Sequence, residues 1–205
     1  SENVVLSLQA ADALINSMLE ASRLDAGVVA PKLEVFRLKD LFDQLDREFT
    51  AMANQREIGF RVVATNLAVF SDPHLLRRIL QNFLSNAVRY TSQGGVLLGC
   101  RRRGNVLRIE VWDTGPGIPL DKRREIFQEF RRLKTPEYDK AEKGLGLGLA
   151  IAERISRLLN HPINLRSWWR HGSVFSVDVP LGEMPLISPV LTQPTVDNLG
   201  NLAGM

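Results

Sequence analysis

Two asparagines and an arginine share one side of a predicted helix. Asn82, Asn86 and Arg89 are spaced i, i+4 and i+7 in segment 72–91, which places them within about 60° of arc. They border an apolar face, where an amide costs desolvation free energy unless it has a partner. Mg²⁺ takes few protein ligands and fills its shell with phosphates and water. The pattern therefore suits an amide oxygen on a metal–triphosphate, with the arginine near the phosphates.

An acid and two glycines follow the end of a predicted strand. The stretch "VWDTGPGIP" ends the strand at Asp113 and then places Gly115 and Gly117. A buried carboxylate there can accept a hydrogen bond from an exocyclic amine such as that of adenine, and glycines let a flat ring approach the backbone. Taken alone, the stretch is equally compatible with an ordinary turn capped by Asp113.

A second glycine-rich segment leads into a helix. "KGLGLGLAIAERISRLL", residues 143–159, has three alternating glycines directly before an apolar helical pattern. Because glycine weakens helices, the backbone there needs unusual angles or is approached closely. The P-loop pattern is absent, and a dinucleotide-binding pattern would need glycine in place of Leu149. The unpaired amides of the helix start favour an anion, although a tight turn is the simpler alternative.

The elements that must position these residues are helices and a mixed sheet. Helical periodicity predicts amphipathic helices over 4–25, 38–56 and 72–91, with Ser71 as cap, Asp72 in the first turn and Pro73 behind it. A hairpin turning at Gly104-Asn105 is expected. The other expected elements are a short helix through Phe127, a polar loop over 131–143, and strands at 33–36, 58–64 (with 69–70 as its short partner), 95–103, 106–113, 163–169 and 173–180. The predicted fold class is α+β, a two-layer α/β sandwich with the helices on one face of the sheet.

Composition limits the class of protein. The 205 residues, 44% hydrophobic and 24% charged, are typical of a soluble globular chain. No stretch approaches the roughly 20 apolar residues of a membrane span, and no signal-peptide pattern opens the chain. The single cysteine, Cys100, excludes an internal disulfide framework and is expected buried in a strand. The net charge of +3 is too small, and its arginine clusters too dispersed, to favour nucleic acid.

Four motifs together resemble one family. "NFLSNAVRYT", "DTGPGIP", "FQEF" and "GLGLGL", in this order and spacing, resemble the N, G1, F and G2 boxes of sensor histidine kinases. That family shares its ATPase superfamily with type II topoisomerases, Hsp90 and MutL proteins. The resemblance spans residues 4–181 and implies the Bergerat-type ATP-binding fold, with ATP and Mg²⁺ as cofactors. The glycines would then let a loop close on the triphosphate, and 131–143 would form a lid.

The resemblance also assigns roles by position. Asn86 is the implied magnesium ligand, Asp113 the adenine-recognising acid, and Asn82 and Arg132 the implied catalytic residues. Arg89 stands where the family often has lysine, and Leu145 replaces the more usual threonine or serine. Phe127 and Phe130 match the aromatic box. The implied nucleotide-binding residues are Asn82, Asn86, Arg89, Tyr90, Asp113, Gly115, Gly117, Ile118, Phe130, Lys143, Gly144, Leu145, Gly146, Leu147, Gly148 and Ser173.

Three regions are expected on this resemblance. Residues 1–28 resemble the second helix of a dimerisation and histidine-phosphotransfer domain, 32–182 the catalytic domain, and 183–205 a linker or tail. None of His74, His161 and His171 precedes an acid, so the acceptor histidine is expected on a helix outside this sequence. The implied partners are the protein's own acceptor helices and a response-regulator receiver domain, with a homodimeric whole protein in the cytoplasm and no nucleic acid.

Two other functions fit the same superfamily. A topoisomerase- or chaperone-type ATPase would normally carry a water-activating glutamate four residues before the magnesium asparagine, where this chain has Asn82. That difference favours phosphoryl transfer over hydrolysis. A non-catalytic nucleotide-binding regulatory module is the other alternative, and the populated ATP-facing positions argue against it.

Overall fold

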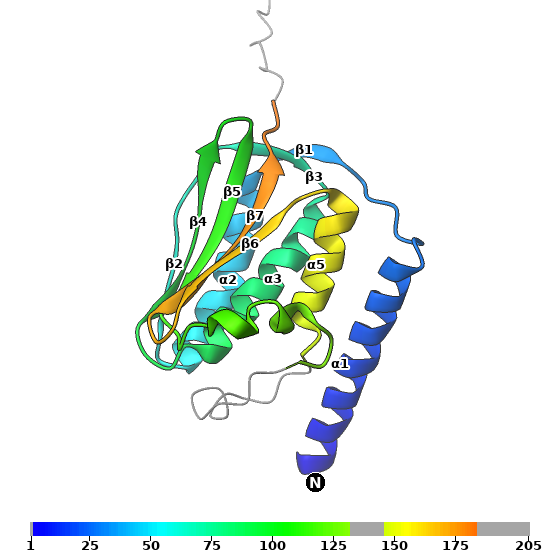
Figure 1. Cartoon of the computed structure of the whole chain (residues 1–205), viewed down its shortest axis with the longest axis vertical. Helices are drawn as coiled ribbons and strands as arrows, with labels where there is room; N and C mark the ends of the chain where they lie inside the picture. Colours follow the sequence, from blue (N-terminus) through cyan, green and yellow to red (C-terminus); the bar gives the residue numbers. More distant parts are fainter. Residues whose placement is uncertain (1, 132–145, 184–205) are drawn as a thin grey trace, which may run out of the picture.

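The protein is built of two layers beside a separate N-terminal helix. The computed structural model describes residues 2–131 and 146–183. Helices α2 (Leu38–Gln55), α3 (Pro73–Tyr90) and α5 (Gly148–Leu159) form one layer and lie on one face of a five-stranded sheet (Figure 1). The predicted α+β sandwich is therefore confirmed.

The sheet is mixed. Its strands follow the order β2 (Gly59–Val62), β4 (Gly95–Arg103), β5 (Val106–Asp113), β7 (Gly172–Pro180) and β6 (Ile163–Trp168). β2 pairs with β4 in parallel, and all other neighbours are antiparallel. The predicted hairpin is β4–β5, with Gly104 in the left-handed conformation that its turn requires.

One predicted strand pairing is wrong. Residues 69–70 belong to β3 (Ala68–Ser71), which pairs with β1 (Glu34–Arg37) and not with β2. Val69 is fully buried and also bridges to Leu181, so β3 closes the end of the sandwich. β2 instead pairs with β4. The local sequence of a short strand does not specify such a long-range pairing.

The start of α3 carries the N-terminal cap that the sequence indicates, shifted by one residue. Asp72 is the capping residue, and its Oδ1 accepts hydrogen bonds from the backbone N–H of His74 at 2.9 Å and Leu75 at 3.0 Å. Its Oδ2 accepts from the Lys32 N–H at 2.8 Å. The predicted assignment of Ser71 as the cap is wrong, because Ser71 still belongs to β3. The cap fixes where α3 begins and hence the facing of its polar edge.

The core lies between the helices and the sheet. Phe83 of α3 and Phe175 of β7 stack with ring centroids 5.3 Å apart, and Phe49 of α2 lies 6.3 Å from Phe60 of β2. The inward positions of β5 are fully buried (Leu107, Ile109 and Val111). Burial of these side chains is what holds the polar edge of α3 against the strand ends. Cys100 is only half-buried, so the prediction of a buried cysteine is met in part.

Helix α1 (Glu2–Asp25) lies beside α5 (Figure 1). Ion pairs join its last turns to the layer of helices: Glu20 with Arg78 of α3 at 2.5 Å, and Asp25 with Arg154 of α5 at 2.6 Å. Several apolar side chains nearer the N-terminus of α1 are exposed, among them Leu8, Ile15, Met18 and Leu19. Among the helices in the described ranges, none is long and apolar enough to cross a membrane.

Candidate functional site

The polar edge of α3 meets the start of α5. Asn82 donates its Nδ2–H to the Arg78 carbonyl at 2.9 Å, which turns its Oδ1 toward α5. A β-carbon on Gly148 would lie only 2.6 Å from that Oδ1. A larger residue here would displace the Asn82 amide, so Gly148 allows the close contact between the two helices.

Asn86 lies one turn farther along α3, half-buried. Its side-chain amide makes no hydrogen bond to any residue in the described ranges. Those ranges also contain no cluster of three or more histidine, cysteine, aspartate or glutamate side chains that could hold a metal. A half-buried amide without a protein partner is what a metal–phosphate ligand would use.

Asp113 ends β5 in a largely desolvated position. Its Oδ1 accepts two backbone hydrogen bonds, from Gly115 N–H at 2.9 Å and Ser173 N–H at 3.2 Å. Burial raises the pKa of this carboxyl from 3.8 to about 6, although the two hydrogen bonds act in the opposite direction. Among the described residues, both donors to Asp113 reach Oδ1 and none reaches Oδ2. Oδ2 is thus an acceptor on a half-buried side chain and is available to a ligand donor.

Asp113 should make the folding stability of the ligand-free protein fall between pH 4 and pH 7. With its pKa higher in the folded state, the folded protein binds more protons through this interval, so stability falls as pH rises. The Asp113 contribution approaches roughly 3 kcal/mol. His161, whose pKa burial lowers, acts with the opposite sign. The free energy of unfolding in urea is measured for wild type and Asp113→Asn at each pH. Because both proteins contain His161, its contribution cancels in the difference between them. A pH-independent difference between the two proteins would contradict this expectation.

The loop after Asp113 is held by serines of the sheet. Ile118 donates its N–H to Ser167 Oγ at 2.6 Å, and that oxygen lies 2.9 Å from Ser173 Oγ. Ser167 also donates to the Gly172 carbonyl at 3.2 Å. Ile118 and Ser173 are both buried. Sequence analysis missed Ser167; the available signal was a polar residue at an inward position of β6.

Two glycines of this loop are positioned by close backbone contacts. A β-carbon on Gly115 would lie 2.9 Å from Asp113 Oδ1 and 3.3 Å from the Tyr90 carbonyl. Gly117 has φ +66° and packs on the backbone of Trp168. The loop therefore lies against the end of α3, and Thr91 is beside it. The Thr91 hydroxyl is buried, has no partner among the described residues and was not predicted.

The segment between β5 and α5 is shaped by two short 3₁₀ turns, η1 (Leu120–Lys122) and η2 (Glu125–Phe127), where one short helix was predicted. Phe127 packs edge-on against Phe175 at 6.4 Å. Exposed Phe130 donates its N–H to the Gly146 carbonyl at 3.0 Å, so residues 130 and 146 lie side by side. The predicted site residues Arg132, Lys143, Gly144 and Leu145, and the predicted lid 131–143 apart from Arg131, lie outside the described residues.

The described candidates border α3 at two points. Gly148 contacts Asn82, and Gly115 lies against Tyr90, eight residues and about 12 Å farther along the helix. Asn86 and Arg89 lie between these points. One end thus presents an amide and a helix N-terminus, which suit anions. The other presents a half-buried acceptor beside glycines, which suits a flat ring carrying an amine. Leu147 caps α5 and is buried in the core, so only its backbone faces this region.

Comparison with known proteins agrees with this geometry. A family model described as "Histidine kinase-, DNA gyrase B-, and HSP90-like ATPase" matches residues 71–183. The circadian input-output histidine kinase CikA of Synechococcus elongatus is 37% identical over 191 residues, which cover 91% of this chain and 25% of CikA. The adaptive-response sensory kinase SasA of Microcystis aeruginosa is 31% identical, over 82% of this chain and 44% of SasA. The chain therefore spans less than half the length of these relatives.

Solved structures of similar proteins share the architecture. Full-length ShkA in complex with AMPPNP has a TM-score of 0.74 and 30% identity, over 84% of this chain and 36% of ShkA. The catalytic domain of the histidine kinase ThkA, in a nucleotide-free form, has a TM-score of 0.61 and 25% identity, over 73% of this chain and 97% of that domain. The likeness to ThkA thus extends over nearly the whole of that catalytic domain.

Proposed function

This chain belongs to the histidine kinase-, DNA gyrase B- and HSP90-like ATPase family, as a catalytic domain of the histidine kinase type, and from this premise we propose that it transfers the γ-phosphoryl group of ATP to a protein histidine. The observation that carries the proposal is Asp113, a half-buried, largely desolvated carboxyl whose Oδ2 is available to a ligand amine. The alternatives of a non-catalytic module and a topoisomerase- or chaperone-type ATPase are not favoured.

In the proposed pose, adenine lies at the Asp113 end and the triphosphate at the α5 end. Oδ2 of Asp113 accepts a hydrogen bond from the adenine amine, and Gly115 and Gly117 allow the ring to approach the loop. Ser173 holds the acid through its backbone N–H. At the other end, the start of α5 offers unpaired amides and a positive dipole to the phosphates. Arg89 lies on α3 between the two ends, and Tyr90 lies at the adenine end.

Asn86 is proposed as the magnesium ligand because its half-buried amide has no partner in the described ranges. When bound, magnesium supplies charge neutralisation of the phosphate oxygens in phosphoryl transfer. Asn82 supports the same site: its Oδ1 faces Gly148, which keeps α3 and the phosphate end of α5 in contact. Arg132 is proposed to contact the terminal phosphate.

None of the three histidines of this chain is suited to accept the phosphoryl group. His74 begins α3, twelve residues and about 18 Å before Asn86. His161 is buried past the far end of α5, with Nε2 2.8 Å from Ser71 Oγ. His171 lies beside Ser173, at the adenine end. The acceptor is therefore proposed to be a histidine on a dimerisation helix paired with α1 in a homodimer, for relay to a receiver-domain aspartate.

The transfer step tests the proposal. An imidazole nitrogen of the acceptor attacks the γ-phosphorus in line, the bond to the β–γ bridging oxygen breaks, and ADP leaves. With radiolabelled ATP and Mg²⁺, this chain alone should acquire no acid-labile label. A separately produced two-helix acceptor domain, with histidine followed by an acid, should become labelled. Labelling is expected to be slow, because untethered domains lose effective concentration.

Asn86→Ala serves as the matched variant. It should abolish labelling of the acceptor and weaken Mg-ATP binding much more than metal-free ATP binding, as measured by titration calorimetry. Equal losses with and without Mg²⁺ would mean that Asn86 only supports the helix. Strong acid-labile labelling of this chain itself, removed by changing one of its three histidines, would overturn the assignment of an external acceptor.

A further inference from the structure

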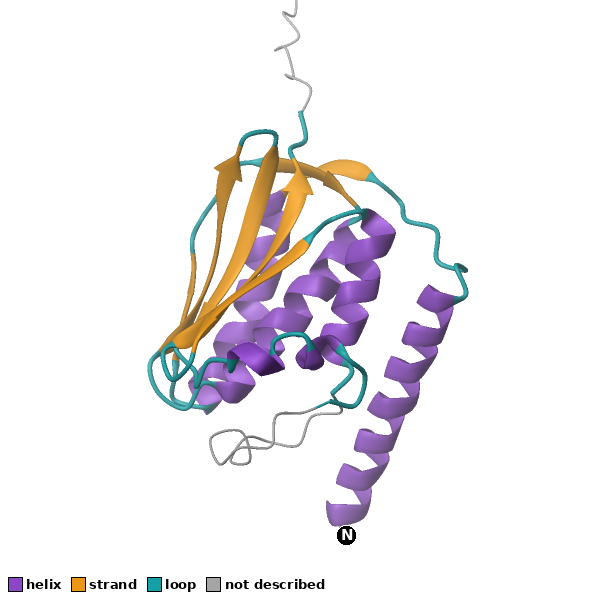
Figure 2. Cartoon of the chain, in the orientation of Figure 1, coloured by secondary structure: helices purple, strands orange, loops and turns teal. Residues whose placement is uncertain are grey.

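The outer face of the sheet, opposite the helices, carries an unusual set of side chains. Among the described residues no helix covers this face (Figure 2). Its Trp112 and Trp168 are 38% and 48% exposed, and Trp169, in the turn that follows β6, is 37% exposed. These are all three tryptophans of the chain. Exposed aromatic side chains grouped on one surface are typical of interaction sites.

An arginine orders two of these rings. The register places Trp112 of β5 opposite Val174 of β7, and Val174 opposite Arg166 of β6. The Arg166 guanidinium carbon lies 5.4 Å from the Trp112 ring centroid and 6.0 Å from that of Trp168. Val174 beneath them is only 1% exposed. The cluster is thus preorganised, which lowers the entropy lost when a partner binds.

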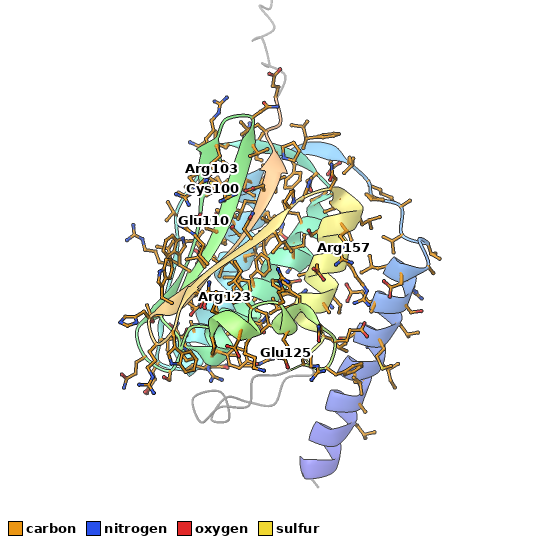
Figure 3. All side chains as sticks on the ribbon, in the orientation of Figure 1. Cys100, Arg103, Glu110, Arg123, Glu125 and Arg157 are labelled. Atoms are coloured by element: carbon orange, nitrogen blue, oxygen red, sulfur yellow. The ribbon has the colours of Figure 1, made fainter. Side chains whose placement is uncertain are left out.

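The acids of this face are already neutralised within it. Glu110 is buried and lies 2.6 Å from Arg101 and 3.5 Å from Arg166; its Oε2 also accepts a hydrogen bond from Trp112 Nε1 at 3.2 Å. Asp178 pairs with Arg108 at 2.6 Å, with both side chains largely buried. The hairpin that carries Arg103 and Glu110 is seen in Figure 3.

What the face offers to a partner is therefore positive charge. Strand alternation places five arginines and two acids on it, an excess of three positive charges (Arg61, Arg101, Arg103, Arg108 and Arg166 against Glu110 and Asp178). Arg101 and Arg166 keep 43% and 45% of their side-chain surface exposed despite their shared acid. Each guanidinium has five N–H donors, so the single Glu110 carboxylate cannot satisfy the donors of both Arg101 and Arg166.

We propose that this tryptophan–arginine face, centred on Trp112, Arg166 and Trp168, is a docking surface for an acidic protein segment that carries apolar side chains beside its carboxylates. Carboxylates would pair with the outward guanidinium edges, and an apolar side chain would pack on the exposed rings. A second copy of this chain is disfavoured, because two such faces would bring arginines together. Nucleic acid is disfavoured, because Arg166 already lies over the ring faces on which bases would stack.

Tryptophan fluorescence reports on this surface, because two of the three tryptophans of the chain, Trp112 and Trp168, lie on it. The probes are a synthetic glutamate–leucine peptide, polyglutamate and single-stranded oligothymidylate. We expect a saturable change of emission with the glutamate–leucine peptide, and weaker binding of polyglutamate. Arg166→Ala should weaken the peptide by about tenfold or more, while Glu110 keeps its pairing with Arg101. Arg166→Lys retains the charge but loses the planar stacking. Its affinity for the peptide should lie between those of wild type and Arg166→Ala.

Arg157→Ala is the matched control. Arg157 is exposed on α5, in the other layer (Figure 3), and its loss removes the same charge. It should leave peptide binding unchanged, and circular dichroism should show all variants folded. The proposal is overturned if the peptide causes no saturable change, if oligothymidylate binds more tightly than the peptide, or if Arg157→Ala weakens binding as much as Arg166→Ala. None of these readouts depends on phosphoryl transfer, so failure here is distinct from failure of the proposed kinase activity.

Discussion

Asp113→Asn is expected to lower ATP affinity by about ten- to a hundredfold. The expected loss follows from one hydrogen bond between a charged oxygen and the adenine amine, which contributes roughly 1.5–3 kcal/mol. The carboxyl is desolvated enough that its pKa rises to about 6, so at neutral pH the ligand-free protein holds a poorly compensated charge. A nucleotide amine would supply the compensation that the two backbone donors leave incomplete.

The substitution is informative because it preserves the rest of the site. Both protein donors, Gly115 N–H and Ser173 N–H, reach Oδ1, which asparagine retains. The change is confined to the second position, where an NH₂ group replaces Oδ2 and meets the adenine amine donor to donor. The fold should survive, and the ligand-free variant should be more stable than wild type at pH 7.

Titration calorimetry with two nucleotides checks the assignment. Inosine triphosphate has a 6-oxo group in place of the amine, so it should bind wild type poorly and gain affinity in Asp113→Asn, whose NH₂ can donate to the oxygen. The ratio of ATP to inosine triphosphate affinity should therefore shrink in the variant. Unchanged ATP affinity would remove Asp113 from the site, and an equal loss for both nucleotides would mean that the variant only disturbs the loop.

Local chemistry made much of this site predictable from the sequence. The helix period placed Asn82, Asn86 and Arg89 on one edge of α3, and a strand followed by glycines placed Asp113 at a buried strand end. Both depend on neighbours within a few residues, and the fold class follows from the same patterns. The four ordered motifs then pointed to the family, which the comparisons confirm.

Contacts between distant residues were not predictable in this way. Ser167 lies 49 positions from Ile118 in the sequence, yet its hydroxyl accepts the N–H of that residue. The pairing of β1 with β3 depends on the sandwich closing around Val69. In the sequence alone, Arg166 resembles any other surface arginine. Only the strand register shows that it lies over Trp112. In each case tertiary packing decides among options that the local sequence leaves equal.

Gly117→Ala should be among the most destabilising single-methyl changes in the protein. Gly117 has φ +66°, and a β-carbon there would lie 2.0 Å from the Trp168 carbonyl oxygen, which belongs to backbone and cannot rotate away. The left-handed conformation and the forced displacement together should cost roughly 2–5 kcal/mol of unfolding free energy. The loop 116–118 is also held to β6 by the hydrogen bond from Ile118 to Ser167. The loop therefore cannot move away from Trp168 without losing that hydrogen bond.

Gly104→Ala separates the two causes. Gly104 has nearly the same backbone angle, φ +59°, but a β-carbon there would meet nothing within 4 Å. Its substitution should carry only the conformational cost, about 1–2 kcal/mol, and should leave ATP binding unchanged. Thermal and urea unfolding of both variants give the difference, which reports the contact with Trp168. Because Gly117 also lies under the proposed adenine position, its variant should lose nucleotide affinity even at temperatures where it remains folded. Equal stability losses in the two variants would mean that the loop yields freely at Trp168, and that Gly117 is required for its backbone angle alone.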